Sequence, residues 1–182
     1  MTGKIFLWDY RTKIIISDID GTITRSDVMG LVMPRFGHDW SHPGICNLYQ
    51  KVHKNGYQIL YLTARAIGQS ISTRNYIGNL RQDTDNKRLP KGPLIMSPDR
   101  LLHSFNREVI LKRPQVFKIA CLKNIVKLFP RDVQPFYCGF GNRETDAISY
   151  VDVGVPLSKV FIINTDGEIT QCEQPNYQKT YN

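Results

Sequence analysis

The sequence predicts a single α/β domain in which helices cover both faces of a mainly parallel β-sheet. Three observations lead to this fold class. The chain of 182 residues is long enough to bury one sizeable core. Short apolar runs alternate with segments of helical periodicity, which is typical of strand–helix–strand units. The first apolar run, Ile14 to Ile16, has no polar position, as expected of a strand that is buried on both faces.

In the first half of the chain, the elements follow from the apolar runs and from the residues that end them. The isoleucine run predicts a strand over 13–17, and the run YQILYLT predicts a second strand over 57–63. Between them, residues 42–53 are expected to be a helix that Asn55 and Gly56 end. Three further elements are expected in order: a helix over about 67–80, a polar loop over 81–92 and a short third strand over 93–96.

In the second half, apolar residues recur at helical spacing within 114–129 and predict a helix there. Residues 136–140 and 160–164 are expected to be the fourth and fifth strands, with a helix over 144–150 between them. The tetrapeptide TDGE at 165–168 predicts a hairpin turn before a short terminal strand. In a sheet of this kind, ligands bind beyond the carboxyl ends of the strands.

The formal net charge of +8 and the pI near 9.4 predict attraction to an anionic partner. A phosphorylated substrate, a membrane surface or a nucleic acid would fit, and dispersed lysines that keep the protein soluble would give the same total. No apolar run approaches the roughly 20 residues that span a bilayer, so membrane contact is expected to be peripheral. The four cysteines form no CxxC pair and are expected to be reduced thiols in a cytoplasmic compartment.

Acidic and polar residues gather where the predicted strands end. Asp18 and Asp20 follow the first strand, Thr63 ends the second, and Asn142 follows the fourth. Because the carboxyl ends of parallel strands meet at one edge of a sheet, these side chains are expected to lie close together. A further candidate is Lys118, near the start of the helix that precedes the fourth strand.

This set of side chains is suited to phosphoryl transfer. A carboxylate such as Asp18 can attack phosphorus and form an aspartyl-phosphate. A second acid two residues on, Asp20, can protonate the leaving alkoxide and then help to activate water. Such an anionic cluster approaches a phosphate dianion only with a hard divalent cation, and Mg²⁺ suits oxygen ligands. Asn142 and Asp146 are four residues apart and would add ligands from one face of a helix.

The remaining candidates would hold the phosphate. Thr63 and the N–H groups after it can bind phosphate oxygens, and Lys118 can neutralise charge on the transferring group. Gly21, which we group with these phosphate-binding residues, allows a sharp turn through which Asp20 reaches back. Arg65, two residues after Thr63, can bind a phosphate with two parallel hydrogen bonds.

Each signal has a plainer interpretation when it is taken alone. A DxDGT motif also occurs as an acidic turn or helix cap, and threonine is common in strands. Lys118 alone would be a solvated helix residue, and Arg65 would cap a helix or form a salt bridge. Asn142 and Asp146 would be an N-cap and a first-turn acid. The order of these residues along the chain favours the catalytic interpretation.

That order resembles the haloacid dehalogenase superfamily of aspartate-nucleophile phosphatases. The resemblance is closer to one branch, the lipin-type phosphatidate phosphatases with their C-terminal catalytic (LNS2) region. It extends over about residues 4–166, in the stretches SDIDGTITRSDVMG, DWSHPGICNLY, NGYQILYLTARAIG, LPKGPLIMSP, REVILKRPQVFKIACL and FGNRETDAISYVDVGVP. It implies a three-layer Rossmann-like haloacid dehalogenase fold with a mainly parallel sheet and a minimal cap, in one domain over residues 1–182.

The resemblance also implies roles for individual residues. Asp18 would be the nucleophile and Asp20 the general acid/base. Asp18, Asp146 and the carbonyl of Asp20 would bind Mg²⁺, with Asn142 beside them. The second and third superfamily motifs would fall on Thr63 and Lys118.

The implied activity is Mg²⁺-dependent hydrolysis of phosphatidate to diacylglycerol and phosphate at a phosphatidate-containing membrane, at the endoplasmic reticulum or nuclear envelope. An N-terminal lipin segment supplied elsewhere would complete a neighbouring immunoglobulin-like sheet, and the apolar residues 1–12 are expected to be a strand of that adjoining sheet. No specific nucleic-acid partner is expected. Two alternatives stay open: a phosphatidate-binding module without catalysis, and a polynucleotide or protein phosphatase of the same superfamily.

Overall fold

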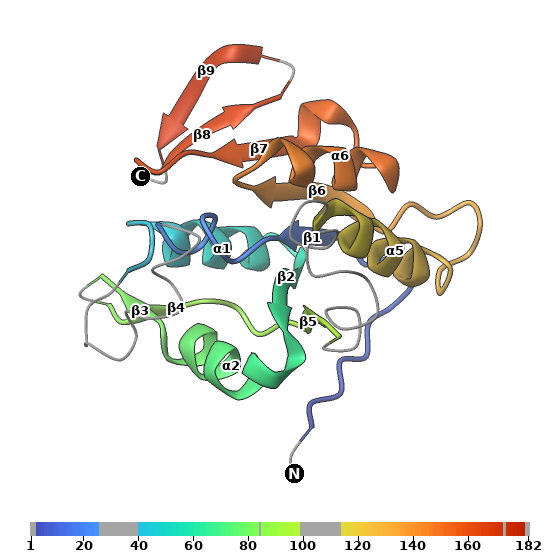
Figure 1. The fold of residues 1–182 in the computed structure, drawn as a ribbon, viewed down its shortest axis with the longest axis horizontal. Coiled ribbons are helices and arrows are strands. Elements are labelled where there is room, and N and C mark those ends of the chain that lie inside the picture. The colour runs from blue at the N-terminus through green and yellow to red at the C-terminus, as the bar shows by residue number, and fades with distance from the viewer. Residues whose placement is uncertain (1–2, 26–39, 84, 99–113, 173, 181–182) are drawn as a thin grey trace.

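The computed structural model describes residues 3–25, 40–83, 85–98, 114–172 and 174–180. Its centre is a seven-stranded sheet with the order β5-β2-β1-β6-β7-β8-β9 (Figure 1). Neighbouring strands from β5 to β7 are parallel, whereas β8 and β9 are added antiparallel. The strands are β1 (Ile14–Ser17), β2 (Gln58–Ala66), β5 (Leu94–Ser97), β6 (Phe136–Gly141), β7 (Val160–Ile163), β8 (Glu168–Gln171) and β9 (Gln174–Thr180).

Helices cover both faces of this sheet. They are α1 (Ile45–Lys54), α2 (Ser70–Asn79), α5 (Pro114–Val126) and α6 (Glu144–Asp152), with the short 3-10 helices η3 (Ile67–Gln69) and η4 (Leu157–Lys159). The predicted α/β fold class with a mainly parallel sheet is therefore confirmed.

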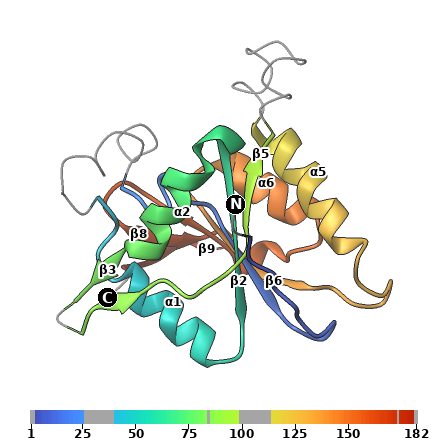
Figure 2. The same ribbon diagram turned by 90° about the horizontal axis from the view of Figure 1, so that it is seen from below.

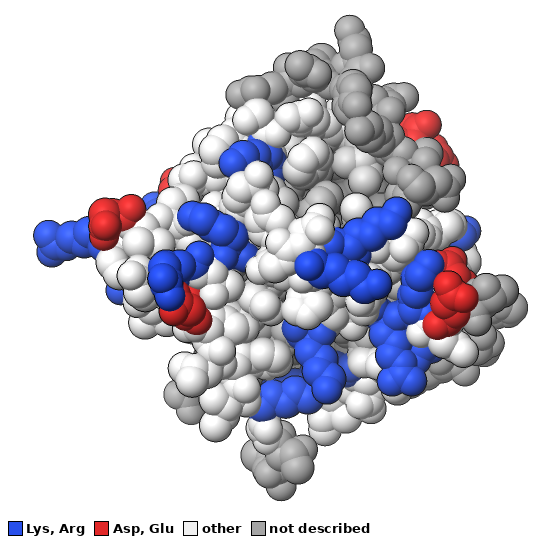
Figure 3. All heavy atoms as spheres, turned by 180° about the vertical axis from the view of Figure 1, so that it is seen from behind, with Lys and Arg blue, Asp and Glu red and all other residues white. Residues whose placement is uncertain are grey.

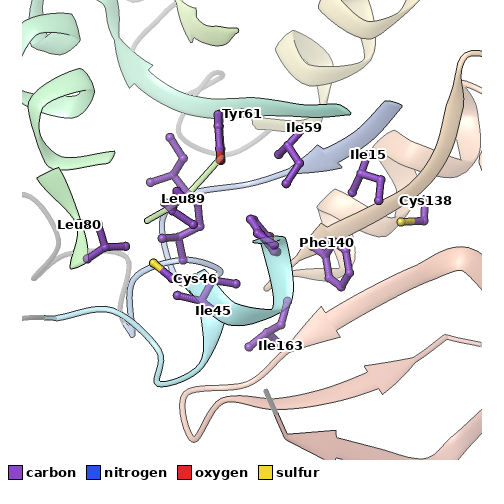
Figure 4. Close-up of a cluster of buried hydrophobic side chains, with 13 residues drawn as sticks. Ile15, Ile45, Cys46, Ile59, Tyr61, Leu80, Leu89, Cys138, Phe140 and Ile163 are labelled. Atoms are coloured by element: carbon purple, nitrogen blue, oxygen red, sulfur yellow. The ribbon is translucent and has the colours of Figure 1, made fainter. Parts of the chain in front are cut away.

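The side chains of β1 alternate between two buried layers, because successive residues of a strand point to opposite faces. Ile15 belongs to the cluster that contains Ile45 of α1, and Figure 4 shows it with Ile59 and Tyr61 of β2. Ile14 and Ile16 belong to the other cluster, with Leu122 of α5 and Tyr150 of α6. Both faces of β1 are buried, which is why the strand has no polar position before Ser17.

The order of the strands determines where a ligand would bind. From β1 the chain proceeds outward through β2 to β5, and it then returns to the other side of β1 as β6 and continues to β7. The connections after β1 and β6 therefore leave in opposite directions. A crevice opens at the carboxyl ends of two strands where this reversal occurs, and ligands of such sheets bind there.

The loop expected over 81–92 is partly wrong, because β3 (Arg81–Gln82) and β4 (Lys87–Arg88) pair as an antiparallel hairpin. Gln82 anchors this hairpin. Its side chain is buried and donates to the His42 carbonyl at 2.8 Å. The polar composition of the segment indicated a loop, whereas a buried amide with its own partners holds it in place.

Other differences concern the ends of elements. The helix expected from residue 42 begins at Ile45, and β2 continues beyond Thr63 to Ala66. The turn at 165–168 is present, with Gly167 at φ +84°, but two strands follow it where one was expected.

The expected minimal cap concerns residues 26–39 and 99–113, which lie outside the described residues. Residues 3–12 form no strand in this structure, and their place in an adjoining sheet stays a prediction. Over the described ranges, no helix is both long enough and apolar enough to cross a membrane.

Candidate active site

The carboxyl edge of the sheet brings together residues from three neighbouring strands. Asp18 directly follows β1, and its N–H donates to the Phe140 carbonyl of β6 at 3.0 Å. Thr63 lies in β2, and Asn142 directly follows β6. The main chain of Asp18 is thus held between strands that also carry the other candidates.

Lys118 lies between two carboxylates. Its Nζ donates to Asp18 Oδ1 at 2.5 Å and to Asp146 Oδ1 at 2.6 Å. The exposed fractions are 4% for Asp18, 5% for Lys118 and 2% for Asp146. Charges so far from water are stable only when they are paired, and here each carboxylate has the same ammonium as its partner. The three predicted residues therefore form one buried ionic cluster.

The protonation of this cluster depends on both burial and charge. Burial raises the pKa of the Asp18 carboxyl to about 7, Lys118 opposes the rise, and Asp146 adds to it. Burial lowers the pKa of Lys118, but the two carboxylates outweigh that effect and hold the pKa above its usual value. Lys118 is therefore a permanent cation beside Asp18.

The backbone around the start of α6 fixes Asp146. Its Oδ2 accepts the N–H of Asn142 at 3.1 Å and the N–H of Arg143 at 3.2 Å. A Cβ on Gly141 would lie only 2.4 Å from the Asp146 Cβ, so glycine permits this close approach of strand and helix. Contrary to expectation, Asn142 does not share a helical face with Asp146, because α6 begins at Glu144. Its role as a metal ligand stays a prediction.

Asp20 is directed toward β2 and away from the lysine. Arg65 Nη2 donates to Asp20 Oδ1 at 2.5 Å, and Arg65 Nε donates to Asp20 Oδ2 at 2.9 Å. The Thr63 hydroxyl also donates to Oδ2, at 3.0 Å. Arg65 is in turn held by Thr73 of α2, whose Oγ1 accepts from Nη1 at 3.3 Å. In this structure Arg65 and Thr63 thus contact the second acid, and their contact with a phosphate stays a prediction.

A sharp turn directly follows the two acids, as expected. Gly21 has φ +81°, a left-handed conformation that favours glycine. Its N–H donates to the Thr24 hydroxyl at 3.0 Å, and the Thr22 hydroxyl lies 3.4 Å from Asp18 Oδ2 as a donor. Behind the turn, Nε2 of the buried His42 lies 3.4 Å from the Gly21 carbonyl oxygen. The turn is therefore supported on both sides.

The donors at this edge fit a hard divalent cation. Asp18 and Asp146 both direct Oδ1 to the Lys118 ammonium, so two carboxylates lie side by side here. Mg²⁺ in proteins is usually held by one or two carboxylates plus a substrate phosphate. No cluster of three or more His, Cys, Asp or Glu side chains able to hold a metal occurs in the described part of the chain. The Asp20 carboxylate is directed to Arg65, so from this residue only the main-chain carbonyl would be a donor, and Asn142 stays a predicted ligand.

Two supporting residues, Thr73 and His42, were not found from the sequence. Thr73 is fully buried in α2, where its hydroxyl holds Arg65. A threonine in a helical stretch and a single histidine carry no signal that distinguishes them from ordinary packing residues. Their contacts depend on how α2 and the segment before α1 pack, which a local pattern does not specify.

The chain is a Rossmann-like α/β domain of the haloacid dehalogenase type, with two acids after the first strand and a lysine–aspartate pair from later elements. The family follows from comparison of the sequence. This chain belongs to the LNS2 (Lipin/Ned1/Smp2) family, whose model matches residues 1–182. The resemblance expected from the motifs is therefore confirmed.

Curated relatives agree with this family. The chain is 51% identical over 179 residues to phosphatidate phosphatase PAH1 of Arabidopsis thaliana and 48% identical over 193 residues to phosphatidic acid phosphohydrolase 1 of Saccharomyces cerevisiae. It is 47% identical over 179 residues to phosphatidate phosphatase LPIN2 of Homo sapiens. The matches cover 98%, 100% and 98% of this chain but 20%, 22% and 20% of the relatives. The chain thus spans about a fifth of their length.

Proposed function

We propose that this chain carries the catalytic centre of a Mg²⁺-dependent phosphatidate phosphatase, which hydrolyses phosphatidate to diacylglycerol and phosphate. The observation that carries the proposal is the buried cluster of Asp18, Lys118 and Asp146 at the carboxyl edge of the sheet. The substrate class is supported by the relatives, which are named phosphatidate phosphatase or phosphatidic acid phosphohydrolase.

In the first step, a carboxylate oxygen of Asp18 attacks the phosphorus of phosphatidate. A bond forms between Asp18 and phosphorus while the bond from phosphorus to the glycerol oxygen breaks. Asp20 donates a proton to that oxygen, and diacylglycerol leaves. Lys118, which already contacts Asp18, keeps this carboxylate oriented and offsets the negative charge that gathers during transfer.

In the second step, water attacks the phosphorus of the aspartyl-phosphate. Asp20, now ionised, accepts a proton from the water, and the Asp18 carboxylate is regenerated as phosphate leaves. The same residue therefore acts as acid and then as base. Asp20 must be correctly positioned in both steps. The hydrogen bonds from Arg65 and Thr63 hold its carboxylate in that position.

Asp18, Asp146 and the Asp20 carbonyl would hold Mg²⁺, with Asn142 nearby. A bound Mg²⁺ supplies positive charge that lets a phosphate dianion approach an acidic site. When both carboxylates are ionised, their negative charge exceeds the positive charge of the single ammonium. The excess negative charge favours a further cation.

The substrate is a membrane lipid, so we further infer peripheral contact with a phosphatidate-containing membrane of the endoplasmic reticulum or nuclear envelope. The basic charge of the chain favours an anionic surface. An N-terminal lipin segment is proposed as a further partner, because the relatives extend well beyond the region matched here.

The test is phosphate release from phosphatidate in detergent mixed micelles, with Mg²⁺ or with a chelator. Wild type is expected to release phosphate only with Mg²⁺, and Asp18→Asn is expected to lose at least about 10³-fold in turnover because the amide is not a nucleophile. Asp152→Asn is the matched control, since Asp152 is an exposed carboxylate of α6 paired with Lys123. Full turnover in Asp18→Asn would contradict the proposal.

The two alternatives give different results in the same experiment. A binding module would release no phosphate as wild type, and its binding to phosphatidate liposomes would be unchanged in Asp18→Asn. A polynucleotide phosphatase would release phosphate from a 3′-phosphorylated oligonucleotide faster than from phosphatidate.

A further inference from the structure

A pocket of about 300 Å³ lies beside α2 and shares no residue with the acidic cluster. It is bounded by α2, by the connection from β4 to β5 and by the N-terminal segment. Figure 2 shows α2 and this connection side by side. Its volume is at the lower end of the range for pockets that bind small ligands. We call it the α2 pocket.

The charge of the α2 pocket is entirely positive. Lys4, Arg74, Arg88 and Lys91 line it, and no acidic residue does. These four side chains are exposed, and none has a hydrogen bond or ion pair with another residue in the described ranges. By contrast, Lys87 of the neighbouring hairpin is paired with acids. The pocket is therefore a site of uncompensated positive charge that favours an anion.

The walls of the same pocket are largely apolar. Phe6, Ile77 and Leu94 are partly buried there, and Leu89, which also lines the pocket, is buried. An inorganic anion gains nothing from such walls, whereas an amphiphile buries apolar surface against them. Anionic charge joined to a short apolar segment is the chemistry of a phospholipid headgroup with its first acyl carbons.

The basic surface continues beyond this pocket. Arg88 also lines a second cleft, together with Lys51 and Lys54 of α1 and with Lys87. Figure 3 shows Lys and Arg spread over the face opposite to the view of Figure 1, with Asp and Glu toward its margins. Two adjoining basic clefts fit a surface that presents many anions better than one soluble ion.

We infer that the α2 pocket binds the headgroup of an acidic phospholipid in a membrane, at a site separate from the catalytic one. Arg74, Arg88 and Lys91 contact the phosphate, and Phe6 and Ile77 contact the first acyl carbons. This binding is independent of the catalytic step, so it persists in a protein that does not turn over substrate.

The test is co-sedimentation of the full chain with phosphatidylcholine vesicles, with and without phosphatidylglycerol, in chelator. Arg74→Gln/Lys91→Gln removes two charges from the pocket. Gly78→Phe adds a bulky side chain to the pocket lining and keeps every charge, because Gly78 lines the pocket and a Cβ there meets nothing within 4 Å. Lys127→Gln/Arg131→Gln is the control, since it removes the same charge from exposed positions outside the pocket.

Wild type is expected to bind only the vesicles with phosphatidylglycerol. Arg74→Gln/Lys91→Gln should weaken the apparent affinity by about tenfold or more, and Gly78→Phe by a similar factor, whereas the control should stay within about twofold. Thermal unfolding of each variant verifies that it is folded, and the two pocket variants test the site by independent means.

Several results would overturn the inference. An equal loss of vesicle affinity in the control would show that only the overall charge of the protein matters. Wild-type affinity in Gly78→Phe would show that the α2 pocket does not take part in binding. Release of the protein by inorganic phosphate, but not by chloride at the same ionic strength, would assign the pocket to a soluble anion. Binding of polyglutamate with the same dependence on the variants, and no binding to vesicles, would assign it to an acidic protein partner.

Discussion

Lys118 is the residue on which the buried cluster depends, because it is the shared partner of Asp18 and Asp146. Lys118→Met keeps most of the side-chain volume but leaves two buried carboxylates without a counter-charge. We expect the free energy of unfolding to fall by about 3–5 kcal/mol, measured by urea denaturation in chelator. Lys123→Met is the matched control on α5. Its pair with Asp152 is exposed to solvent, and we expect a change within about 1 kcal/mol. Equal effects of the two substitutions would contradict this role of Lys118.

Arg65 is expected to act as a positioning residue through Asp20. Arg65→Met removes the hydrogen bonds that orient this carboxyl, so we expect kcat to fall by about 10²-fold while KM changes by less than about threefold. Arg65→Lys should recover part of the loss. Thr73→Val should lower kcat in the same direction but less, because it removes only the support of Arg65. A rise in KM with unchanged kcat would instead assign Arg65 to the phosphate, as the sequence suggested.

The residues of the site differ in how well their contacts could be predicted from the sequence. Asp18 and Asp146 were predictable because they follow strands β1 and β6, whose carboxyl ends meet at one edge of the sheet. Lys118 lies in α5, and its place beside them was expected from the order of motifs that resembles the superfamily. The partner of Asp20 was not, because an arginine two residues after Thr63 reaches either a phosphate or a carboxylate. That choice depends on side-chain orientation in three dimensions.

At the scale of elements, the contact between β6 and α6 positions Asp146. Gly141→Ala places a Cβ about 2.4 Å from the Asp146 Cβ, so α6 must shift away from the strand. We expect a loss of about 1–3 kcal/mol in the free energy of unfolding, together with lower phosphatase turnover.

The control for this substitution is Gly78→Ala. Gly78 lies within α2, and a Cβ there meets nothing within 4 Å. We expect stability to be unchanged or raised by up to about 1 kcal/mol, because alanine favours helix more than glycine does. A Gly141→Ala variant that unfolds and turns over like wild type would show that the contact is not required.

The elements that the sequence predicted best are those with strong apolar periodicity. The runs that became β1, β2, β6 and β7 are buried on the sheet, so their pattern and their burial have the same cause. The β3–β4 hairpin is different, since a buried glutamine anchors two-residue strands in a polar segment. Strand β9 adds to β8 in a polar stretch, QPNYQKT, whose pairing depends on the neighbouring edge and not on its own pattern.

At the scale of the whole molecule, His42 links stability to pH. Burial lowers its pKa below the usual 6.5, Arg25 acts in the same direction, and the Gly21 carbonyl and Asp166 oppose the shift. Below about pH 6.5 the unfolded chain binds a proton that the folded chain does not. The contribution of the neutral His42 side chain to the free energy of unfolding is therefore complete above that pH and is lost as the pH falls.

We expect His42 to make the free energy of unfolding decrease as the pH falls, by at most about 1.4 kcal/mol per pH unit. Asp18, with its pKa raised to about 7, acts in the opposite direction over the same range, so the effect of His42 is the difference between wild type and variant. His42→Gln should remove that part of the slope. Urea denaturation of wild type and variant between about pH 7.5 and about pH 5 measures it. Parallel curves for the two proteins would contradict the assignment.

The proposed mechanism requires that phosphorus becomes covalently attached to Asp18 during turnover, which can be measured. Wild type is mixed with phosphatidate labelled at phosphorus in the presence of Mg²⁺, quenched in acid within the first turnover, and digested. We expect label on the peptide that contains Asp18, released by hydroxylamine as expected of an acyl phosphate, and no label in Asp18→Asn. Label on another residue, or the same label in Asp18→Asn, would contradict it.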